Sequence, residues 1–391
     1  MTTDRKQYDV AIAGAGPAGS SLAIRLANAG LSVILTEQKA FPREKLCGEF
    51  ISPECQIHFN ELGVLPDIKA AGGTELKETV FFAQSGKGVA VESAWFGVPD
   101  SLALGLSRAE MDLILFSRAK AVGVDVRGET SVSGLDVEDG RVVGVTLRDK
   151  SGIESDIKAN LTIDATGRTR SLARRLDQRN VTKTAAELVA FKTHLSDARL
   201  LPATCEIYVY RGGYGGCNRV ENDLYNLCFI ASAADARRLG SDPERVMREV
   251  VCSNKRAAIA LSHAKVVKPW HAVPIERFGR GELVPAPGLI AIGDAAAFID
   301  PFTGSGMLLA MESARIAAGV ISNYIVKDLD LSVLEADYRS AYAAAFNTRL
   351  RICSILRHAA FLPFLAESLI AALSFSSKMT QGLARATRSG A

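Results

Sequence analysis

Apolar and polar positions along the start of the chain follow the pattern of a β–α–β unit. Residues 8–13 are apolar apart from Asp9, as expected of a strand that is buried on both faces of a parallel sheet. Residues 17–29 have the spacing of a helix and are followed by Gly30, and residues 31–35 form a second apolar run. The chain is therefore predicted to begin with a strand, a helix and a second parallel strand.

Three later segments show related patterns of strand, turn and helix. Residues 161–176 run from a strand into a turn with the sequence DATG, and basic residues follow. Residues 289–318 run from an apolar strand ending in Gly-Asp into a helix of small residues, and residues 106–126 contain an amphipathic helix that Arg108 opens. These segments predict further elements of the same parallel sheet.

Segments with strict alternation predict antiparallel sheets instead. Residues 130–165 contain short alternating runs separated by Asp-Gly and Ser-Gly turns, which predicts a three-stranded meander covering the parallel sheet. Residues 187–196, 204–212 and 224–232 alternate as strands of a second sheet with one buried face. The predicted fold class is α/β: a Rossmann-like domain with a β-meander, a smaller α+β domain with an antiparallel sheet, and C-terminal helices.

This pattern divides the chain into a discontinuous first domain, a second domain and an alanine-rich helical region. The predicted boundaries are 1–76, 103–180 and 268–330 for the first domain, 77–102 and 181–267 for the second, and 331–391 for the helical region. Because ligand pockets occur preferentially at domain interfaces, the substrate is expected between the second sheet and the first domain.

Composition and charge narrow the classes of protein that fit this pattern. The 391 residues carry a net charge of +3 without a Lys/Arg block, so no nucleic-acid partner is predicted. The seven cysteines lack the paired spacing of metal ligands and are expected to be reduced thiols, and no metal is predicted. The N-terminus shows no apolar signal-peptide segment, so the expected location is the cytoplasm.

The first turn carries a dinucleotide-binding pattern, in which Gly14, Gly16 and Gly19 form G-x-G-x-x-G. The first glycine permits a tight turn, the second lets a pyrophosphate approach the backbone, and the third lets helix and strand pack closely. The helix directs its free N–H groups at the phosphates. Glu37 lies at the end of the second strand. A carboxylate at this position can accept hydrogen bonds from the ribose hydroxyls of a dinucleotide, and it would repel the 2′-phosphate of NADP. The pattern therefore predicts a bound dinucleotide.

The segment 289–318 distinguishes FAD from NAD. Asp294 at its strand end suits a ribityl hydroxyl, and the helix that begins near Gly304 would direct N–H groups at the flavin edge where charge accumulates on reduction. Arg108 opens its helix where it can meet a phosphate or ribose. The chain has no second glycine motif with strand and helix context, so NAD(P)H is expected to bind transiently at the flavin.

In this order and at these distances, the four elements resemble the FAD-dependent oxidoreductases of the para-hydroxybenzoate hydroxylase fold. This group includes class A flavin monooxygenases, flavin halogenases and the geranylgeranyl reductase family. The resemblance covers nearly the whole chain and implies an enzyme whose main catalyst is the flavin. The residues that it implies for cofactor binding are Gly14, Gly16, Pro17, Ala18, Gly19, Glu37, Gln38, Arg43, Cys47, Gly48, Arg108, Asp164, Gly167, Gly293, Asp294, Pro301, Gly304, Ser305, Gly306 and Met307.

One segment separates the branches of this group. Residues 41–54, FPREKLCGEFISPE, look like the P-R-x-K-x-C-G-x-x-x-S-P segment of the geranylgeranyl reductases. By that match Arg43, Lys45, Cys47 and Gly48 would line the cofactor or the mouth of the substrate cavity. Halogenases resemble this segment too, but in place of their W-x-W-x-I-P motif this chain has a single KPWHAVP. The catalytic candidates are Cys47, Lys45 and, from the second domain, Tyr214.

The hairpin of the second domain departs from the reductase pattern. Residues 212–230 place Gly216 and Cys217 where the reductases have larger residues, which would leave the cavity floor more open, and Tyr214 is expected beside the ligand. Three functions remain open: a reductase of a double bond in an isoprenoid-like lipophilic substrate, a monooxygenase of an aromatic or polyketide substrate, and a flavoprotein that binds a ligand without turnover.

The C-terminal region carries the last apolar pattern. Residues 361–375 are short for a membrane span and are interrupted by Pro363 and Glu367, which predicts an amphipathic helix. The helices of this region are expected to cap the cavity, to form a dimer interface or to touch a membrane surface. The sequence leaves open whether the protein is a monomer or a homodimer and whether it uses NADH or NADPH.

Overall fold

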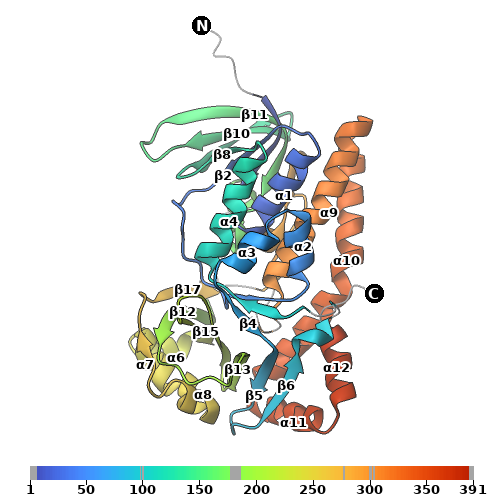
Figure 1. The fold of residues 1–391 in the computed structure, drawn as a ribbon. Helices are drawn as coiled ribbons and strands as arrows, with labels where there is room; N and C mark the ends of the chain where they lie inside the picture. Colours follow the sequence, from blue (N-terminus) through green and yellow to red (C-terminus); the bar gives the residue numbers. More distant parts are fainter. Residues whose placement is uncertain are drawn as a thin grey trace.

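The computed structural model describes residues 7–96, 98, 101–176, 186–275, 278–298, 302 and 304–386. Within them the chain forms two bodies, each built on one large sheet, with helices from the C-terminal part of the chain along one side (Figure 1). Each body contains one of the two large sheets that the pattern of apolar and polar residues predicts.

The first sheet combines a parallel part with a meander, as the sequence predicts. Its strands are β1 (Gln7–Ala13), β2 (Val33–Thr36), β8 (Asp125–Arg127), β9 (Ser131–Glu138), β10 (Arg141–Arg148), β11 (Glu154–Asp164) and β19 (Leu289–Ala291). Their order is β8-β2-β1-β11-β10-β9, and β19 pairs with the end of β11. The first half of β11 is antiparallel to β10, while β11 also runs parallel to β1.

Helices cover one face of the parallel part of this sheet, and the meander folds over the other face. The helices are α1 (Pro17–Asn28), α4 (Arg108–Ala121), α9 (Gly306–Lys327) and α10 (Leu331–Ala360). Val10 and Ile12 of β1 pack with the helices, whereas Ala11 packs with Val145 and Leu147 of the meander. Because side chains alternate along a strand, β1 is buried on both faces, which confirms the expectation for the first apolar run.

Short elements complete the first body and link it to the second. They are α2 (Cys55–Glu61), α3 (Leu65–Ala70), α5 (Ser171–Leu176), β3 (Phe50–Ile51), β4 (Thr74–Leu76), β7 (Ala103–Gly105), β18 (Gly279–Arg280) and β20 (Ala297–Phe298), with 3-10 turns at Ser93–Phe96, Gly167–Thr169, Val251–Ser253 and Gly293–Ala295. Strands β3, β7 and β4 form a small sheet where the chain passes between the two bodies (Figure 1).

The second sheet has eight strands and is antiparallel except where β13 runs parallel to β5. Its strands are β5 (Glu78–Phe82), β6 (Gly88–Glu92), β12 (Leu188–Ser196), β13 (Thr204–Tyr210), β14 (Gly213–Arg219), β15 (Tyr225–Ser232), β16 (Lys265–Val266) and β17 (His271–Ile275). The order is β16-β12-β15-β14-β13-β5-β6, and β17 also pairs with β12. The segment from residue 268, which the sequence assigns to the first domain, therefore begins in the second sheet.

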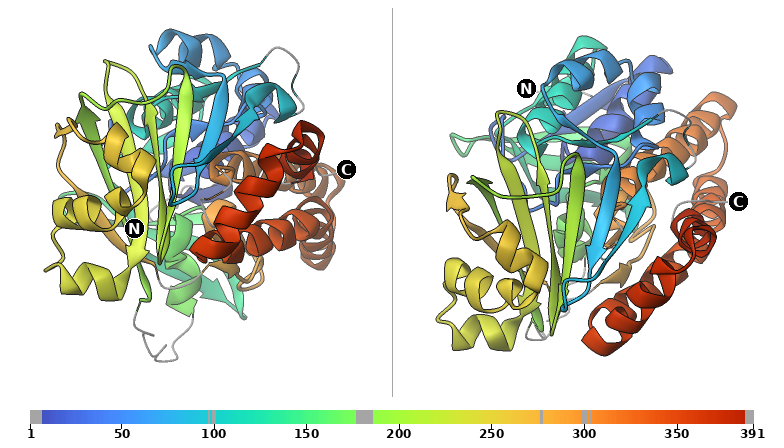
Figure 2. Two further views of the ribbon diagram at one scale, coloured as in Figure 1. Left: turned by 90° about the horizontal axis from the view of Figure 1, so that it is seen from below. Right: turned by 60° about the horizontal axis from the view of Figure 1, so that its bottom comes forward.

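Two sets of helices cover opposite faces of the second sheet (Figure 2). They are α6 (Ala233–Arg238), α7 (Pro243–Glu249) and α8 (Lys255–Ala260) on one face, and α11 (Pro363–Ser374) and α12 (Ser377–Ala386) on the other. In contrast, α10 packs on the first body, where Tyr338 and Phe346 are buried. The predicted C-terminal region is thus shared between both domains. Of the helices in the described residues, none is long and apolar enough to cross a bilayer.

Candidate active site

The glycine turn after β1 has the geometry that its motif predicts. Gly14 has a φ of +103°, and a Cβ there would lie 2.4 Å from the carbonyl oxygen of Ala165. A Cβ on Gly19 would lie 1.9 Å from the carbonyl oxygen of Gly14, so only glycine lets α1 approach the turn this closely. A Cβ on Gly16 would meet only the guanidinium groups of Arg108 and Arg43, at 3.7 and 3.8 Å. The backbone at Gly16 therefore faces two cations rather than packed protein.

The two arginines are held by one buried carboxylate that the sequence analysis did not identify. Asp112 is fully buried, and it accepts two hydrogen bonds of 2.8 Å from Arg108. Its Oδ2 also lies 3.0 Å from Nη1 of Arg43. Burial alone would lower the pKa of Arg108, but the charge and hydrogen bonds of Asp112 and the nearby Cys47 together outweigh it and raise that pKa. The sequence does indicate that Arg108 and Asp112 can pair, because residues four apart lie on the same side of a helix.

Glu37 ends β2 close to this pair of arginines. Its carboxylate lies 3.1 Å from Nη2 of Arg43, and it accepts from the backbone N–H groups of Ala15 at 3.3 Å and Lys39 at 3.2 Å. These contacts orient the buried carboxylate beside the glycine turn, whereas Gln38 is exposed. The role of Glu37 as acceptor for ribose hydroxyls stays a prediction.

The second cofactor segment adjoins the first through Gly293, just after β19. Gly293 has a φ of +58°, and a Cβ there would lie 2.8 Å from that of Ala18, so the segment packs tightly on α1. Burial raises the pKa of the neighbouring Asp294, although Arg108 and Lys45 favour its charged form. The structure thus brings residues of both predicted cofactor segments together.

The start of α9 follows the same segment. Gly304 has a φ of +63°, Gly306 is the first residue of α9, and Ser305 and Met307 are buried. Pro301, which the sequence analysis includes among the cofactor residues, lies outside the described residues. The role of the first turn of α9 in stabilising negative charge on the flavin stays a prediction.

Asp164 has a different use from the one expected of it. Its carboxylate is fully buried and accepts from the backbone and hydroxyl of Thr166 at 3.0 and 2.6 Å, and from the N–H groups of Leu172 and Ala173 at 3.1 and 3.2 Å. These bonds hold the turn around Gly167 and cap α5. Since both oxygens are occupied by the protein, Asp164 supports the turn rather than offering its carboxylate to a ligand.

The segment that carries Lys45 and Cys47 lies between the arginines and the second sheet. Burial, together with the nearby Arg43, lowers the pKa of Lys45. The thiol of Cys47 accepts from the N–H of Glu49 at 3.4 Å and lies within hydrogen-bonding reach of Arg108. A cation beside a partly exposed thiol is the setting that favours a reactive cysteine.

An apolar cavity of about 170 Å³ is lined by residues of the second sheet and of helices α11 and α12. At one end it reaches Gly48 and Gly304 of the two cofactor segments, and at the other it reaches Leu373 of α11 and Leu383 of α12. No charged side chain of the described residues lines it. An apolar cavity therefore adjoins both predicted cofactor segments, where the substrate is expected from the domain organisation.

Tyr214 lines this cavity, and its contact with a ligand stays a prediction. Its ring is 4% exposed and makes edge-to-face contacts with Phe302 at 5.1 Å and Phe361 at 6.1 Å between ring centroids. The sequence analysis missed the cavity residues of α11, among them Ala366 and Ile370. The available signal was the high apolar content of α11, because such a helix has an apolar face to bury.

The expected open floor at Gly216 and Cys217 is not found. A Cβ on Gly216 would lie 3.0 Å from Cδ1 of Ile207, so the side chain of the neighbouring strand fills the space. Cys217 points to the opposite face of the sheet and is fully buried there. The departure from the reductase hairpin pattern therefore does not enlarge the cavity at this point.

Comparison with known proteins places the chain among proteins with an FAD binding domain. Residues 7–325 match the family described as FAD binding domain. The chain is 26% identical over 362 residues to a digeranylgeranylglycerophospholipid reductase from Methanocella arvoryzae, with 90% of this chain and 88% of the relative covered. Among solved structures, the flavin-dependent brominase Bmp2 has a TM-score of 0.80 at 21% identity, with 98% and 94% covered. A geranylgeranyl bacteriochlorophyll reductase-like protein from Thermoplasma acidophilum has a TM-score of 0.77 at 20% identity, with 97% and 96% covered.

Proposed function

The chain belongs to the FAD binding domain family and is an FAD-dependent oxidoreductase, and from this premise we propose that it reduces a carbon–carbon double bond of a lipophilic, isoprenoid-like substrate. NAD(P)H is the reductant expected for this family. The observation that carries the proposal is the cavity, because it is apolar, closed by α11 and α12, and open toward the cofactor segments at Gly48 and Gly304. The likeness to a lipid reductase supports it.

The residues of the first domain fit FAD. The backbone at Gly16 leaves space in front of Arg43 and Arg108, and Nε of Arg43 is buried without a hydrogen-bond partner among the described residues. A buried donor without a partner is costly, and a pyrophosphate oxygen would satisfy it. Arg43, Arg108 and the N-terminus of α1 would hold the pyrophosphate, and Glu37 would accept from the adenosine ribose.

The chain's own contribution to reduction is positioning, shielding and proton supply. Reduced FAD supplies the hydride equivalent, and one proton must reach the other carbon of the double bond. Cys47 is the candidate proton donor, since its thiol lies beside Arg108 and it directly precedes Gly48, which lines the cavity. Tyr214, Phe302 and the inner face of α11 hold the substrate and exclude water.

Product analysis tests this proposal against the monooxygenase alternative. The FAD-loaded enzyme is incubated with NADH or NADPH and a panel of geranylgeranyl lipids, aromatic polyketides and quinones, with and without labelled oxygen. We expect a product that gains two hydrogens whether or not oxygen is present. A product that carries labelled oxygen would replace the reductase with a monooxygenase, and binding without turnover would leave a ligand-binding flavoprotein.

We propose in addition that the outer face of α11 and α12 touches a lipid surface from which such a substrate enters. Phe364 and Phe375 are 81% and 90% exposed on that face, although the inner face of the same helices lines the cavity. Lys378 is exposed there, and Glu367, the one acidic residue of 361–386, is hydrogen-bonded to Ser85. An apolar face with added positive charge is typical of helices that lie on anionic membranes.

Sedimentation with anionic phospholipid vesicles tests this contact. Phe364→Ser combined with Phe375→Ser should reduce vesicle binding by about tenfold or more, because burial of two phenyl groups contributes at least 1.4 kcal/mol. The matched control is Ile153→Ser, which removes an exposed apolar side chain from the meander and should change nothing. Unchanged binding in the double variant would refute the contact, and a dimer that the double variant dissociates would assign the face to a second copy of the chain.

A further inference from the structure

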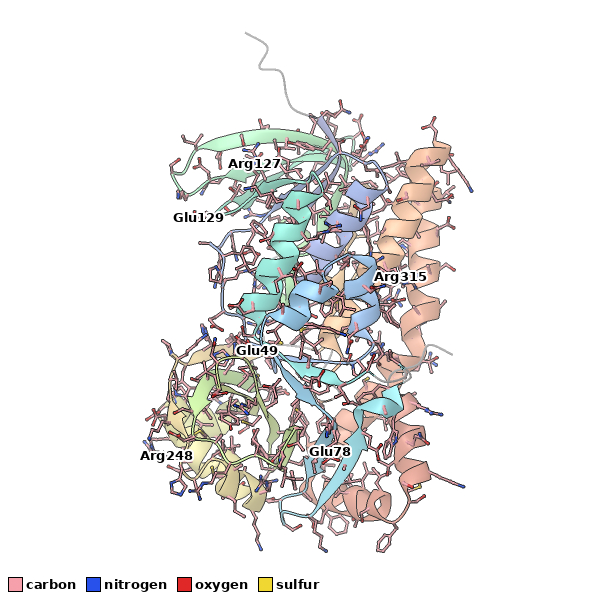
Figure 3. The ribbon with its side chains drawn as sticks, viewed as in Figure 1. Glu49, Glu78, Arg127, Glu129, Arg248 and Arg315 are labelled. Atoms are coloured by element: carbon pink, nitrogen blue, oxygen red, sulfur yellow. The ribbon has the colours of Figure 1, made fainter. Side chains whose placement is uncertain are left out.

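Glu49 lies at the junction of the two bodies (Figure 3). Its side chain is fully buried, and its φ of +51° lies in the left-handed region that non-glycine residues rarely adopt. The carboxylate accepts from Nζ of Lys192 at 2.6 Å and lies 2.6 Å from Nε2 of His194. It also accepts from the backbone N–H of Arg108 at 2.9 Å. One side chain of the first domain is thus bound to β12 of the second domain and to the first residue of α4.

The charges around Glu49 are balanced within the protein. Lys192 is fully buried and also donates to Glu44 at 2.8 Å, and Lys268 donates to the same carboxylate at 2.7 Å. Glu44, Glu49 and His194 are close enough together to ligate a metal, but Nζ of Lys192 is hydrogen-bonded to both carboxylates. Two carboxylates facing two ammonium groups form an ion cluster that needs no metal.

The backbone of Glu49 adds a second set of contacts. Its N–H donates to the thiol of Cys47 at 3.4 Å, and its carbonyl accepts from the side-chain amide of Asn218 at 3.3 Å. The carbonyl of Cys47 accepts from the side-chain amide of Asn226 at 3.1 Å. Asn218 and Asn226 belong to β14 and β15, so the segment 47–49 is fixed to three strands of the second sheet.

The contacts of Glu49 connect the second sheet to Arg108, one of the predicted cofactor-binding residues. Its N–H is held by Glu49, while its guanidinium faces the open backbone of Gly16 and the thiol of Cys47. Glu49 itself does not line the cavity. A carboxylate at the N-terminus of α4 also interacts favourably with the helix dipole. The orientation of α4, and with it of Arg108, therefore depends on a carboxylate that is held from the second domain.

We propose that Glu49 is a positioning residue that couples the second domain to the FAD site, by holding Cys47 and Arg108 in place against the cofactor while touching neither cofactor nor substrate. The proposal depends on FAD binding alone and not on the reaction proposed above. Glu49→Gln keeps the size of the side chain but leaves Lys192 with only Glu44 as a counter-charge. It removes the charge that holds the N-terminus of α4.

Comparing apo-protein stability with FAD affinity separates positioning from simple stability. Glu49→Gln should lower the unfolding temperature of the apo-protein and weaken FAD binding at least tenfold, measured by titration of flavin fluorescence. Glu49→Gln/Lys192→Met also removes the buried lysine that has lost one of its two counter-charges, so the unfolding temperature should return towards that of the wild type. The FAD dissociation constant should stay raised, because the acceptor charge at Arg108 is still missing. If Glu49→Gln alone does not fold, the double variant carries the test.

The second domain offers a matched control in Glu206 and Arg256. Glu206 is fully buried and receives two hydrogen bonds from Arg256, of 2.6 and 2.9 Å, on strand β13 away from the cofactor segments. Glu206→Gln/Arg256→Met should leave the FAD dissociation constant within twofold of the wild type, whatever its unfolding temperature. Recovery of FAD affinity together with stability in Glu49→Gln/Lys192→Met, or unchanged affinity in Glu49→Gln, would overturn the proposal.

Discussion

The cofactor site and the apolar cavity meet at Gly48 and Gly304, and they are built from different kinds of contact. In the cofactor site, charged groups fix one another: Arg43 and Arg108 share Asp112, and Arg43 also pairs with Glu37. Among the described residues the cavity has no charged lining, and its shape comes from side chains on both sheet and helices. The first arrangement suits one ligand of fixed geometry, whereas the second selects by hydrophobicity and size.

The largest effects are expected from substitutions of Gly19, which is needed for packing, and Gly16, which is needed for FAD binding. Gly19→Ala places a Cβ 1.9 Å from the carbonyl oxygen of Gly14 and should cost about 3 kcal/mol or more of folding stability. Gly16→Ala has room in the protein but occupies the space where the pyrophosphate would lie. We expect it to fold normally and to lose FAD. Thermal unfolding and the FAD content of the purified variants measure both effects, and normal FAD content in Gly16→Ala would contradict this account of the site.

A charge change at Glu37 should weaken FAD binding without affecting the cavity. Glu37→Arg removes the acceptor for the ribose hydroxyls and places a cation beside Arg43, at a cost of about 2 kcal/mol in FAD binding. Asp67 is an exposed carboxylate on α3, so Asp67→Arg is the matched control with the same change of charge and should bind FAD normally. Equal FAD dissociation constants for the folded Glu37→Arg variant and the wild type would show that Glu37 is not at the ribose.

Filling the cavity should weaken substrate binding without affecting FAD binding. Ala366 is buried on the inner face of α11, so Ala366→Phe would occupy part of the space available to substrate. We expect FAD binding to be unchanged and the affinity for long-chain ligands to fall about tenfold, or 1.4 kcal/mol. Ala372 is exposed on the same helix, and Ala372→Phe should leave ligand binding unchanged. Ligand titrations monitored by flavin absorbance test both variants, and equal affinities would place the ligand outside this cavity.

The smallest expected effect concerns pH and lies at the junction of the two regions. Partial burial raises the pKa of Glu44, but hydrogen bonds from Lys192 and Lys268 outweigh it and lower the pKa to about 2. A carboxylate with a lowered pKa stabilises the folded state fully above its unfolded pKa of 4.5, and the contribution disappears as the pH falls through about 2. Because Glu44 is partly exposed, we expect about 1 kcal/mol after solvent screening.

Denaturant unfolding of wild type and Glu44→Gln between pH 2 and pH 7 measures that contribution. The wild type should be more stable by a constant amount above pH 4.5, and the difference should shrink towards zero near pH 2. A difference that does not change with pH would mean that the charge of Glu44 does not stabilise the fold.

The glycine turn of the candidate cofactor site could be predicted from the sequence because its residues lie close together along the chain. Gly14, Gly16 and Gly19 occupy one turn, and each meets the steric requirement that its motif implies. Asp112 was missed because its role depends on two arginines from different elements, Arg43 and Arg108, meeting in space. A sequence motif describes residues that are close together along the chain. The contact between Asp112 and Arg43 joins a helix to a distant loop, so no motif contains it.

In the second domain, the contacts between side chains could not be predicted from the pattern of apolar and polar residues. Lys192 and His194 alternate with apolar residues in β12 and have the pattern of an exposed face, yet both are buried against Glu49. Gly216 suggested an open floor, but Ile207 from the adjacent strand fills the space. Strand positions followed from alternation, whereas partners across strands and domains depend on register and packing that no single segment contains.

Transfer of electrons from reduced enzyme to substrate without oxygen tests the central claim most directly. The FAD-loaded enzyme is reduced under anaerobic conditions, freed of NAD(P)H and mixed rapidly with a geranylgeranyl lipid, while the visible absorbance of the flavin is recorded. The account predicts that the flavin is reoxidised and that one product molecule, with two added hydrogens, forms for each flavin. A flavin that stays reduced until oxygen is admitted, followed by a product that contains an oxygen atom, would contradict it.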